Sequence, residues 1–206
     1  MIVIIDYQAG NLTSVVRSLK ALGVEATVTQ DPAVVAEASR VIFPGVGAAG
    51  KAMATLQELG LDQALRQSFH RGVPILGICL GAQIILEHSE ENQVTCLGLL
   101  PGRTRALSPA EGLKIPHMGW NQVRFLRNHQ VFKGLSEGAE YYFVHSYYPD
   151  PAQTAMVLGV THHGREFPSA IGWRNLVATQ FHPEKSGRFG LHILENFLAW
   201  DGSDAE

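Results

Sequence analysis

The chain has 206 residues, of which 46 % are hydrophobic, and its formal net charge is −3. This length and composition are typical of one large globular domain, and the scattered Lys and Arg residues form no basic stripe of the kind that binds nucleic acid. No apolar run approaches the roughly 18 residues that a membrane-spanning helix needs. The first residues, MIVIID, lack the basic segment and the cleavage site of a signal peptide.

The first half of the chain alternates between short apolar runs and amphipathic stretches. The runs predict strands at 2–5, 24–29, 40–43 and 73–78. Apolar residues at helical spacing predict helices at 12–22, 31–39, 48–59, 62–70 and 80–88. Strands that alternate with helices in this way indicate an α/β fold, with a mostly parallel sheet covered by helices on both faces.

The second half consists of short strand-like runs separated by turn residues. These runs are 97–102, 104–107, 121–126, 139–148, 154–163, 169–173 and 176–181. They predict an antiparallel or mixed section added to the parallel sheet, and an amphipathic stretch at 188–200 predicts a last helix that packs back on the sheet. With no linker or repeat in between, we predict one domain over residues 1–200 and a frayed tail at 201–206.

A cysteine stands between two glycines in GICLG, residues 77–81, where a predicted strand passes into a predicted helix. The pattern has the form of the nucleophile elbow, G-x-S-x-G, with Cys79 in the place of serine. The amide groups at the start of the helix would favour a thiolate and help to hold an oxyanion. A buried core cysteine is the alternative, but the two flanking glycines favour a nucleophile.

A thiol nucleophile needs a base, and the chain has nine histidines. His182 follows the end of a predicted strand, Pro183 restrains the backbone beside it, and Glu184 lies two residues on. One turn can therefore present an imidazole and a carboxylate together, as in a catalytic triad. The alternative is a solvated acid after a surface histidine. The presence of GICLG at a comparable strand end favours the triad.

A third glycine-rich turn, PGVG at residues 44–47, follows another predicted strand. Because the carboxyl ends of parallel strands meet at one edge of a sheet, we expect PGVG to lie on the same edge as GICLG. Its backbone amides could then complete an oxyanion hole. A simple turn is the alternative.

Other motifs give no indication of a metal or a cofactor, and we predict neither. His162 and His163 are adjacent, so on a strand they point to opposite faces and read as a surface pair. No Cys/His cluster has zinc spacing, and the glycine motifs that bind nucleotides are missing. Cys79 and Cys96, without an export signal, indicate free thiols in a reducing cytoplasm, and a Cys79–Cys96 disulfide is the less favoured alternative. Cys96 has no motif around it, and we expect it to be inert.

Several motifs together resemble a known family. GICLGAQ with FHPEKS is similar to the class I glutamine amidotransferases, which use a Cys–His–Glu triad. DYQAGNLTSV, PGVGAAG, PHMGWN and YYFVHSYY extend the resemblance, over nearly the whole chain, to the glutaminase subunits of imidazole glycerol phosphate synthase. PHMGWN and YFVHSYY are the specific motifs, because the triad motifs identify only the wider class.

The resemblance implies a class I glutamine amidotransferase-like (flavodoxin-like) fold and a glutaminase mechanism. It implies that Cys79 attacks the side-chain amide of glutamine, that His182 protonates the departing ammonia and then activates water, and that Glu184 orients His182. Backbone N–H groups implied to hold the oxyanion are those of Leu80 and of Val46 or Gly47. Residues implied to lie near the substrate are Gln83, His145, Ser146 and Tyr147.

The resemblance also implies a partner, a (β/α)₈-barrel cyclase bound as a heterodimer. The cyclase would use the ammonia to make imidazole glycerol phosphate and an aminoimidazole carboxamide ribotide in histidine biosynthesis. The family's glutaminases are nearly inactive without the partner, and a reoriented peptide unit in PGVG is our hypothesis for the gate. Residues expected at the partner contact are Asn11, Trp120, Tyr142 and Lys185. The alternative for Trp120 and Tyr142 is a place in the core.

Four positions depart from the family pattern. Gln8 and Ala9 stand where glycine and a second small or apolar residue are more frequent, Ala49 replaces a frequent aromatic residue, and Ala82 replaces a usual methionine. None belongs to the triad, so these departures bear on local packing and on partner contacts.

Three other functions compete with this interpretation. The first is a glutaminase that serves pyridoxal phosphate, anthranilate or GMP synthesis, and PHMGWN argues against it. The second is a free-standing thiol hydrolase or peptidase, which would act without a partner. The third is a non-catalytic binding module, which the intact Cys79, His182 and Glu184 disfavour.

Overall fold

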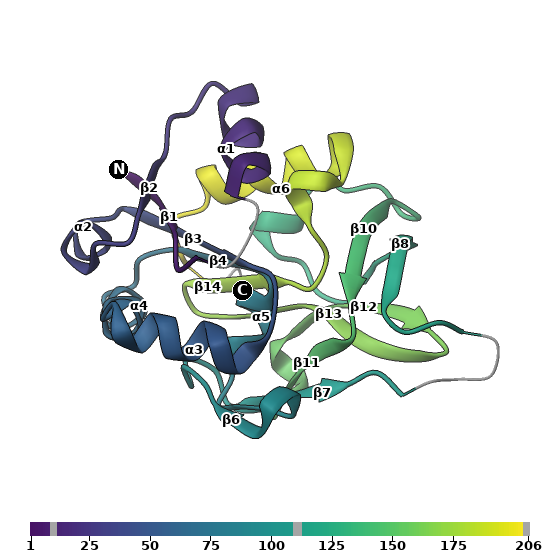
Figure 1. Ribbon diagram of the computed structural model, residues 1–206. Helices are drawn as coiled ribbons and strands as arrows, with labels where there is room; N and C mark the ends of the chain where they lie inside the picture. Colours follow the sequence, from purple (N-terminus) through teal and green to yellow (C-terminus); the bar gives the residue numbers. More distant parts are fainter. Residues whose placement is uncertain (9–11, 109–112, 204–206) are drawn as a thin grey trace.

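The computed structural model describes residues 1–8, 12–108 and 113–203. Its centre is an eight-stranded sheet with the order β2-β1-β3-β4-β14-β13-β12-β9 (Figure 1). These strands are β1 (Ile2–Ile5), β2 (Thr27–Thr29), β3 (Arg40–Gly45), β4 (Ile75–Cys79), β9 (Arg124–Phe125), β12 (Val157–His163), β13 (Arg165–Trp173) and β14 (Leu176–Thr179). From β2 to β14 the pairs are parallel, and from β14 to β9 they are antiparallel.

Helices cover both faces of the sheet because successive apolar residues of a strand point to opposite faces. On β1, for example, Ile4 packs in one core with residues of α1 and α6, whereas Val3 and Ile5 pack in the other with residues of α2, α3 and α4. The helices are α1 (Leu12–Ala21), α2 (Pro32–Ala36), α3 (Ala49–Glu58), α4 (Leu61–His70), α5 (Leu80–Ile84) and α6 (Gly187–Ala199). Figure 1 shows α1 and α6 above the sheet and α3 and α4 below it. The predicted helix-covered parallel sheet is confirmed.

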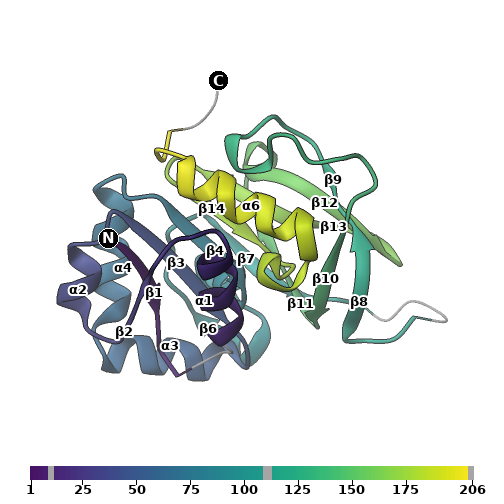
Figure 2. The same ribbon diagram turned by 90° about the horizontal axis from the view of Figure 1, so that it is seen from above.

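Two smaller sheets come from the second half of the chain. β8 (His117–Gln122) and β10 (Glu140–His145) form an antiparallel pair, which Figure 2 shows beside β12 and β13. The other sheet has the order β11-β7-β5-β6, with β5 and β7 parallel. Its strands are β5 (His88–Ser89), β6 (Val94–Thr95), β7 (Gly102–Ala106) and β11 (Tyr147–Pro151). Short 3₁₀ turns are η1 (Glu91–Gln93), η2 (Gln130–Phe132), η3 (Thr154–Met156) and η4 (Pro183–Lys185). The predicted mixed section is confirmed.

Two neighbouring predictions are wrong for one physical reason. Residues 97–101 form a buried loop rather than a strand, and α5 ends at Ile84 rather than at residue 88. The N–H groups of Leu97, Gly98 and Leu99 donate to the carbonyls of residues 84–86. In a helix that reached residue 88, the N–H of residue 88 would need the carbonyl of residue 84, which the loop occupies.

Other boundaries also differ from those predicted. The run 139–148 is two strands, β10 and β11, which part at Ser146 and join different sheets. The second strand and the second helix are shorter than predicted, at 27–29 and 32–36. Residues 204–206 of the predicted tail lie outside the described residues. The described part of the tail is held at Ser203, whose carbonyl accepts from the indole N–H of Trp200.

Gly81 lets α5 lie directly on β3, because it has no side chain. A Cβ at this position would lie 1.9 Å from the carbonyl oxygen of Phe43, a backbone atom that cannot rotate away. Gly81→Ala is therefore expected to lower the free energy of unfolding by roughly 3 kcal/mol or more. Urea denaturation measures the change. Gly50→Ala in α3, where a Cβ meets only the side chain of Asn92, is the matched control; equal effects of the two changes would contradict the prediction.

Candidate active site

Three loops that follow parallel strands meet at one edge of the central sheet. β3 ends at Gly45 and β4 ends at Cys79, and these two residues are register partners. β14, which pairs with β4, ends at Thr179, shortly before His182. The carboxyl ends of parallel strands form the ligand-binding edge of such sheets. The prediction that PGVG and GICLG share an edge is confirmed.

Cys79 occupies a strained turn between β4 and α5. Its φ is 55° and its ψ is −108°, a conformation that costs a non-glycine residue roughly 1–3 kcal/mol. Close packing holds this turn in place, since a Cβ at Gly77 would lie 2.9 Å from the Cβ of Ala178. The Cys79 side chain is 6 % exposed. The turn therefore has the sharp strand-to-helix form of a nucleophile elbow.

The surroundings of the sulfur differ from the prediction in one respect. Because α5 spans only Leu80–Ile84, its dipole is smaller than that of a helix reaching residue 88. Two other polar groups lie at the sulfur. Sγ is 3.7 Å from Nε2 of Gln180 and 4.0 Å from the carbonyl oxygen of Val144. A side-chain amide and a main-chain carbonyl therefore act on the sulfur together with the short helix.

His182 and Glu184 form a buried hydrogen-bonded pair on one tight turn. Nδ1 of His182 lies 2.7 Å from Oε1 of Glu184, and both side chains are at most 4 % exposed. The Ser186 hydroxyl donates to the His182 carbonyl at 2.6 Å, and the His182 amide donates to the Tyr142 carbonyl at 2.9 Å. These bonds fix the turn to α6 and to β10. The predicted pairing of imidazole and carboxylate is confirmed.

The second ring nitrogen of His182 is not used by the bond to Glu184. Nε2 is buried and has no hydrogen-bond partner among the described residues. Burial by itself lowers the pKa of His182, but the charge of the Cys79 thiolate and the bond to Glu184 outweigh it and raise the pKa to about 9. His182 is therefore placed to take the proton of Cys79 and to form a thiolate–imidazolium pair.

Cys79 lines a cavity of about 420 Å³. Val46 and Gly47 of the PGVG turn and Leu80 of α5 line it as well, where the sequence predicts the oxyanion hole. The other lining residues are Gln83, Glu91, Pro116, Val144, His145, Ser146 and Tyr147. All residues predicted to hold the oxyanion or to lie near the substrate are therefore at this cavity, and its volume suits a small molecule.

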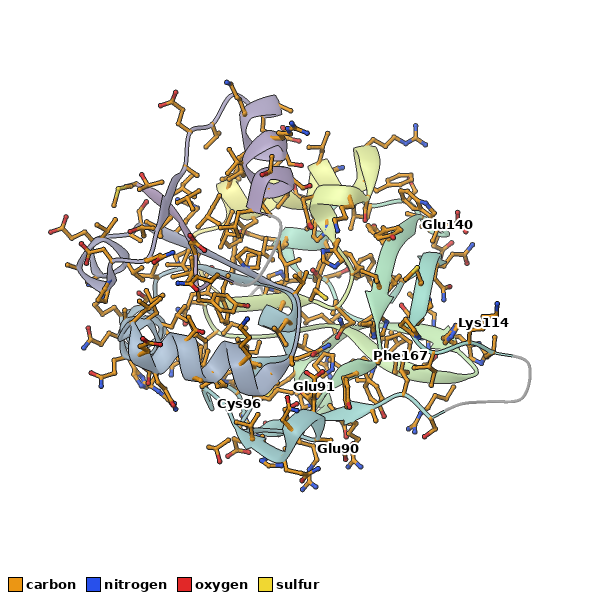
Figure 3. The ribbon with its side chains drawn as sticks, in the orientation of Figure 1. Glu90, Glu91, Cys96, Lys114, Glu140 and Phe167 are labelled. Carbon is orange, nitrogen blue, oxygen red and sulfur yellow. The ribbon has the colours of Figure 1, made fainter. Side chains whose placement is uncertain are left out.

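Glu91 is the one acidic side chain among the described residues of this lining, and no sequence motif singles it out. It lies on η1, next to the start of α3 (Figure 3). Its Oε2 accepts a hydrogen bond from the N–H of Ala49 at 2.7 Å, so it also satisfies a free amide of α3 just beyond the PGVG turn. A carboxylate at this cavity is a natural partner for an ammonium group. Only the folded arrangement identifies Glu91, because η1 follows no predicted strand.

His145 supports the cavity wall. Its Nδ1 lies 2.8 Å from the carbonyl oxygen of Tyr147, and its Nε2 lies 2.9 Å from Nδ1 of His117. His117 in turn stacks on His163, with the ring centroids 4.2 Å apart. Burial, and then neighbouring imidazoles, lower the pKa of His117 to about 4 and that of His145 to about 3. Both rings are therefore neutral in the folded protein near pH 7.

Acidification from pH 7 to pH 5 is expected to destabilise the protein through His117 and His145. Their folded-state pKa values lie below the ordinary 6.5, so the stability they contribute is present above pH 6.5 and is lost as the pH falls toward the folded-state values. At pH 5 the loss is about 2 kcal/mol for each ring. Urea denaturation at the two pH values measures it. His117→Gln should lose about half of this acid sensitivity, and an unchanged dependence on pH would contradict the assignment.

Two of the residues predicted to contact a partner, the exposed Trp120 and the half-buried Tyr142, pack against each other, and a third, Lys185, lies beside them. Trp120 is 55 % exposed, and its ring packs edge-on against Tyr142 with centroids 6.0 Å apart. The Lys185 ammonium lies 5.8 Å from the centre of the Tyr142 ring. Met118, on the same strand as Trp120, is 62 % exposed. We call these four residues the Trp120 surface; the predicted contact Asn11 lies outside the described residues.

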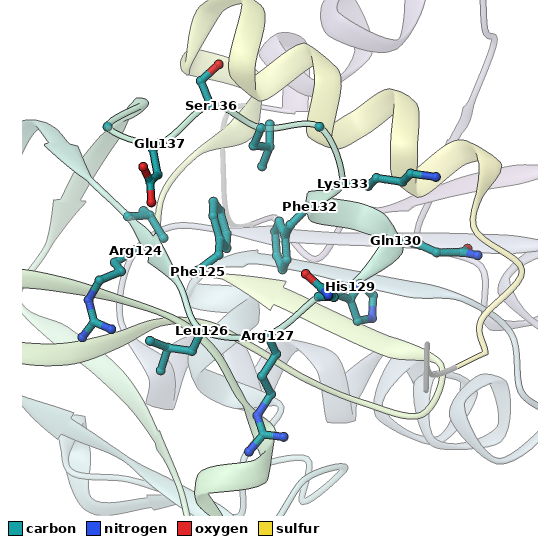
Figure 4. Close-up of a pocket in the computed structure, with 15 residues that line it drawn as sticks. Arg124, Phe125, Leu126, Arg127, His129, Gln130, Phe132, Lys133, Ser136 and Glu137 are labelled. Carbon is teal, nitrogen blue, oxygen red and sulfur yellow. The ribbon is translucent and has the colours of Figure 1, made fainter.

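A larger cavity, of about 720 Å³, is lined by residues 123–130 and 132–138 (Figure 4). Figure 4 shows the stacked rings of Phe125 and Phe132, whose centroids are 4.5 Å apart, with Arg124 and Arg127 at the lower side of the cavity. No cysteine is among its described lining residues, whereas Cys79 lines the smaller cavity. His182 and Glu184 line a third, small hollow, which shares Val46 with the cavity at Cys79. The smaller cavity at Cys79 is therefore the candidate site.

Of the positions that depart from the family pattern, Ala9 lies outside the described residues, and nothing in the structure explains Ala49 and Ala82. Gln8 has a φ of 62°, a conformation that glycine adopts without strain. Glutamine at this position therefore strains the backbone. Ala49 and Ala82 are fully buried in α3 and α5.

Cys96 is a free, buried thiol. Burial raises its pKa to about 11, which makes it a poor nucleophile.

Neither a metal cluster nor a membrane-spanning helix is found among the described residues. No group of three or more of their His, Cys, Asp or Glu side chains is arranged to hold a metal ion. None of the helices in this part of the chain is both long and apolar enough to cross a membrane.

Comparison with known proteins gives consistent findings. A family model described as "Glutamine amidotransferase class-I" matches residues 3–200. The imidazole glycerol phosphate synthase subunit HisH of Moorella thermoacetica is 53 % identical over 197 residues, which cover 95 % of this chain and 93 % of that protein. The protein of the same name from Desulfovibrio desulfuricans is 50 % identical over 206 residues, which cover 97 % of this chain and 94 % of that protein.

Solved structures share the fold at low identity. PurLQS from Thermotoga maritima has a TM-score of 0.75 at 18 % identity, with 96 % of this chain and 97 % of that chain covered. The crystal structure of a glutamine amidotransferase has a TM-score of 0.74 at 20 % identity, with 95 % of this chain and 98 % of that chain covered. These likenesses confirm the predicted fold class.

Proposed function

Because the chain belongs to the class I glutamine amidotransferase family, we propose that it is the glutaminase component of an imidazole glycerol phosphate synthase in histidine biosynthesis. Full-length relatives named as HisH subunits of that synthase, at 48 % and 53 % identity, support the assignment. The observation that carries the chemistry is the Cys79 elbow at one cavity with the buried His182–Glu184 pair beside it.

In the first half of the proposed reaction, Sγ of Cys79 attacks the side-chain amide carbon of glutamine. Backbone N–H groups of Leu80 and of the PGVG turn, at Val46 or Gly47, hold the negative oxygen that forms. The imidazolium of His182 gives its proton to the leaving nitrogen, the C–N bond breaks, and ammonia departs. A γ-glutamyl thioester remains on the sulfur.

In the second half, His182 takes a proton from water, and the hydroxide attacks the thioester carbonyl. The C–S bond breaks, its electron pair returns to Sγ, and glutamate leaves. Throughout, the carboxylate of Glu184 holds the ring of His182 in one orientation and stabilises its charged form. The reaction needs no cofactor.

The cavity lining supports recognition of free glutamine. Glu91 provides a carboxylate for the α-ammonium group. Gln83, Ser146 and Tyr147 surround the rest of the cavity and would meet the α-carboxylate and the side-chain amide. We assign His145 the role of holding the carbonyl of Tyr147 in place.

We place the acceptor of the ammonia on a separate polypeptide, a (β/α)₈-barrel cyclase bound as a heterodimer in the cytoplasm. The cyclase would release imidazole glycerol phosphate and an aminoimidazole carboxamide ribotide. The Trp120 surface supports this contact, since exposed aromatic residues of this kind anchor protein interfaces. It also adjoins the catalytic turn, because Lys185 is part of η4.

One experiment tests the proposal. Glutamate release from glutamine is measured with the chain alone, and then with a candidate cyclase and its nucleotide substrate. The proposal predicts strong dependence on the partner. Full activity of the chain alone would instead identify a free-standing thiol hydrolase. Activation only by the synthase of another pathway would identify a different acceptor, and no turnover under any condition would favour a binding module.

The same assay tests the contact surface. Trp120→Ala is expected to weaken activation by the cyclase, because it removes an exposed aromatic anchor without touching the cavity. Trp173→Ala is the matched control, since Trp173 is also exposed but pairs with Leu176 at the opposite edge of the sheet. Equal loss of activation in the two variants would contradict the placement of the partner.

A further inference from the structure

We propose that Gln180 is a catalytic residue of this site, because its side-chain amide donates a hydrogen bond to the sulfur of Cys79. This bond favours the thiolate before attack and stabilises the leaving thiolate when the thioester is cleaved. Gln180 follows β14 and comes two residues before His182. Its side chain is fully buried, where a primary amide is costly unless both of its ends are hydrogen-bonded. Neither the sequence motifs nor the cavity lining singles it out.

Both ends of this amide are used. Oε1 of Gln180 accepts from Nε2 of Gln83 at 2.9 Å, and Nε2 of Gln180 lies 3.7 Å from Sγ of Cys79. The bond to Gln83 joins residues far apart in the sequence, and the backbone N–H of Gln180 donates to the carbonyl of Ser169 at 2.8 Å. Hydrogen bonds therefore hold both the side chain and the main chain of Gln180.

The direction of the amide is determined by its neighbours. Nε2 of Gln83 also lies 2.9 Å from the carbonyl oxygen of Tyr147, and a main-chain carbonyl can only accept. The amide of Gln83 must therefore present its nitrogen to both groups, and the atom of Gln180 that faces it must be an oxygen. This leaves the NH₂ group of Gln180 for the sulfur.

A donor aimed at the sulfur favours the charged form over the neutral thiol. It acts in both halves of the reaction. Before attack, it helps His182 to hold the proton of Cys79. During cleavage of the thioester the C–S bond breaks with its electron pair going to sulfur, and the N–H of Gln180 stabilises the leaving thiolate. Only this second role rests on the proposed glutaminase function.

The other titratable groups around the sulfur are identified, so the contribution of Gln180 can be separated from theirs. The charge of the thiolate helps to keep the proton on His182. The hydroxyl of Tyr7 is fully buried near the sulfur and stays protonated, because burial and the charge of Cys79 raise its pKa far above the ordinary range. Glu91 and His145 lie in the same cavity lining. A substitution at Gln180 leaves all four of these side chains in place.

The test is the pH dependence of alkylation of Cys79 by iodoacetamide, in a Cys96→Ala background so that one thiol reacts. Gln180→Met keeps the length of the side chain but removes the donor. It should shift the midpoint of the alkylation profile upward by about one pH unit, which is about tenfold less thiolate at a given pH. Gln180→Glu still accepts from Gln83 but turns a negative oxygen toward the sulfur, and it should shift the midpoint further.

Thr161→Val is the matched control. Thr161 is buried and donates to the hydroxyl of Ser169 at 2.7 Å. Ser169 is the residue whose carbonyl accepts from the N–H of Gln180, but no bond joins Thr161 to the sulfur. Its midpoint should match the parent. A Gln180→Met protein that folds and keeps the parent midpoint overturns the proposal; if this variant does not fold, Gln180→Glu decides in the same way. The parent protein could also fail to hydrolyse glutamine under any condition. If the midpoint of Gln180→Met were still shifted from that of the parent, the result would support the role of Gln180 and refute the proposed function.

Discussion

Cys79→Ala is expected to abolish glutamine hydrolysis, with a loss of at least about 10⁴-fold in kcat measured with the partner present. No other described residue of the cavity offers a thiol that could form the thioester. Synthesis driven by added ammonia should remain, because that reaction needs the cyclase and not the thiol. Alanine has a smaller side chain than cysteine at the same turn, so the fold and the Trp120 surface should be preserved.

The control for this prediction is Cys96→Ala. Cys96 is buried, its Sγ donates to the carbonyl of Val94 at 3.6 Å, and its thiol stays protonated near pH 7. Activity should stay near that of the unmodified protein. If Cys79→Ala retained more than a small fraction of glutaminase activity while folded, the assignment of the nucleophile would be wrong.

Glu184→Gln is expected to lower kcat by roughly 10²- to 10⁴-fold with little change in the volume of the side chain. The carboxylate fixes which nitrogen of His182 carries the proton, and its charge helps to raise the pKa of His182 to about 9. A neutral amide removes the charge and can also turn its NH₂ group toward the ring. Both effects reduce the fraction of protein in the thiolate–imidazolium state.

Glu166→Gln makes the same chemical change elsewhere. Glu166 pairs with Arg124 at 2.7 Å on the surface, where both side chains are more than half exposed, and such pairs contribute little. The kcat of the Glu166→Gln variant should equal that of the parent. A Glu184→Gln protein with activity within tenfold of the parent would show that Glu184 does not serve the base.

The parts of the site that can be predicted from the sequence are those encoded in short segments. GICLG carries its own turn geometry, because the glycines on either side of Cys79 are required by close packing. HPE places His182 and Glu184 on one turn, and their hydrogen bond follows from that spacing. Strand ends and helix starts then bring the two segments to one edge of the sheet.

The parts that sequence patterns do not reveal depend on contacts between distant segments. Gln180 meets Cys79 and Gln83 only because β14 inserts next to β4. Glu91 reaches the cavity because it caps α3, which lies far from it in the sequence. The apolar pattern overestimates the length of α5 for a similar reason, since Leu97 takes the carbonyl of Ile84, which the N–H of residue 88 would need in a longer helix. Local patterns contain none of this information.

The most direct test of the proposed mechanism is to trap the covalent intermediate. Isotopically labelled glutamine is mixed with the complex of the chain and its cyclase, the reaction is quenched with acid during turnover, and the peptides are analysed by mass spectrometry. We predict a labelled γ-glutamyl group on the peptide that contains Cys79, which accumulates and decays at the rate of glutamate release. Glutamate release without that adduct, or an adduct on Cys96, would contradict the mechanism.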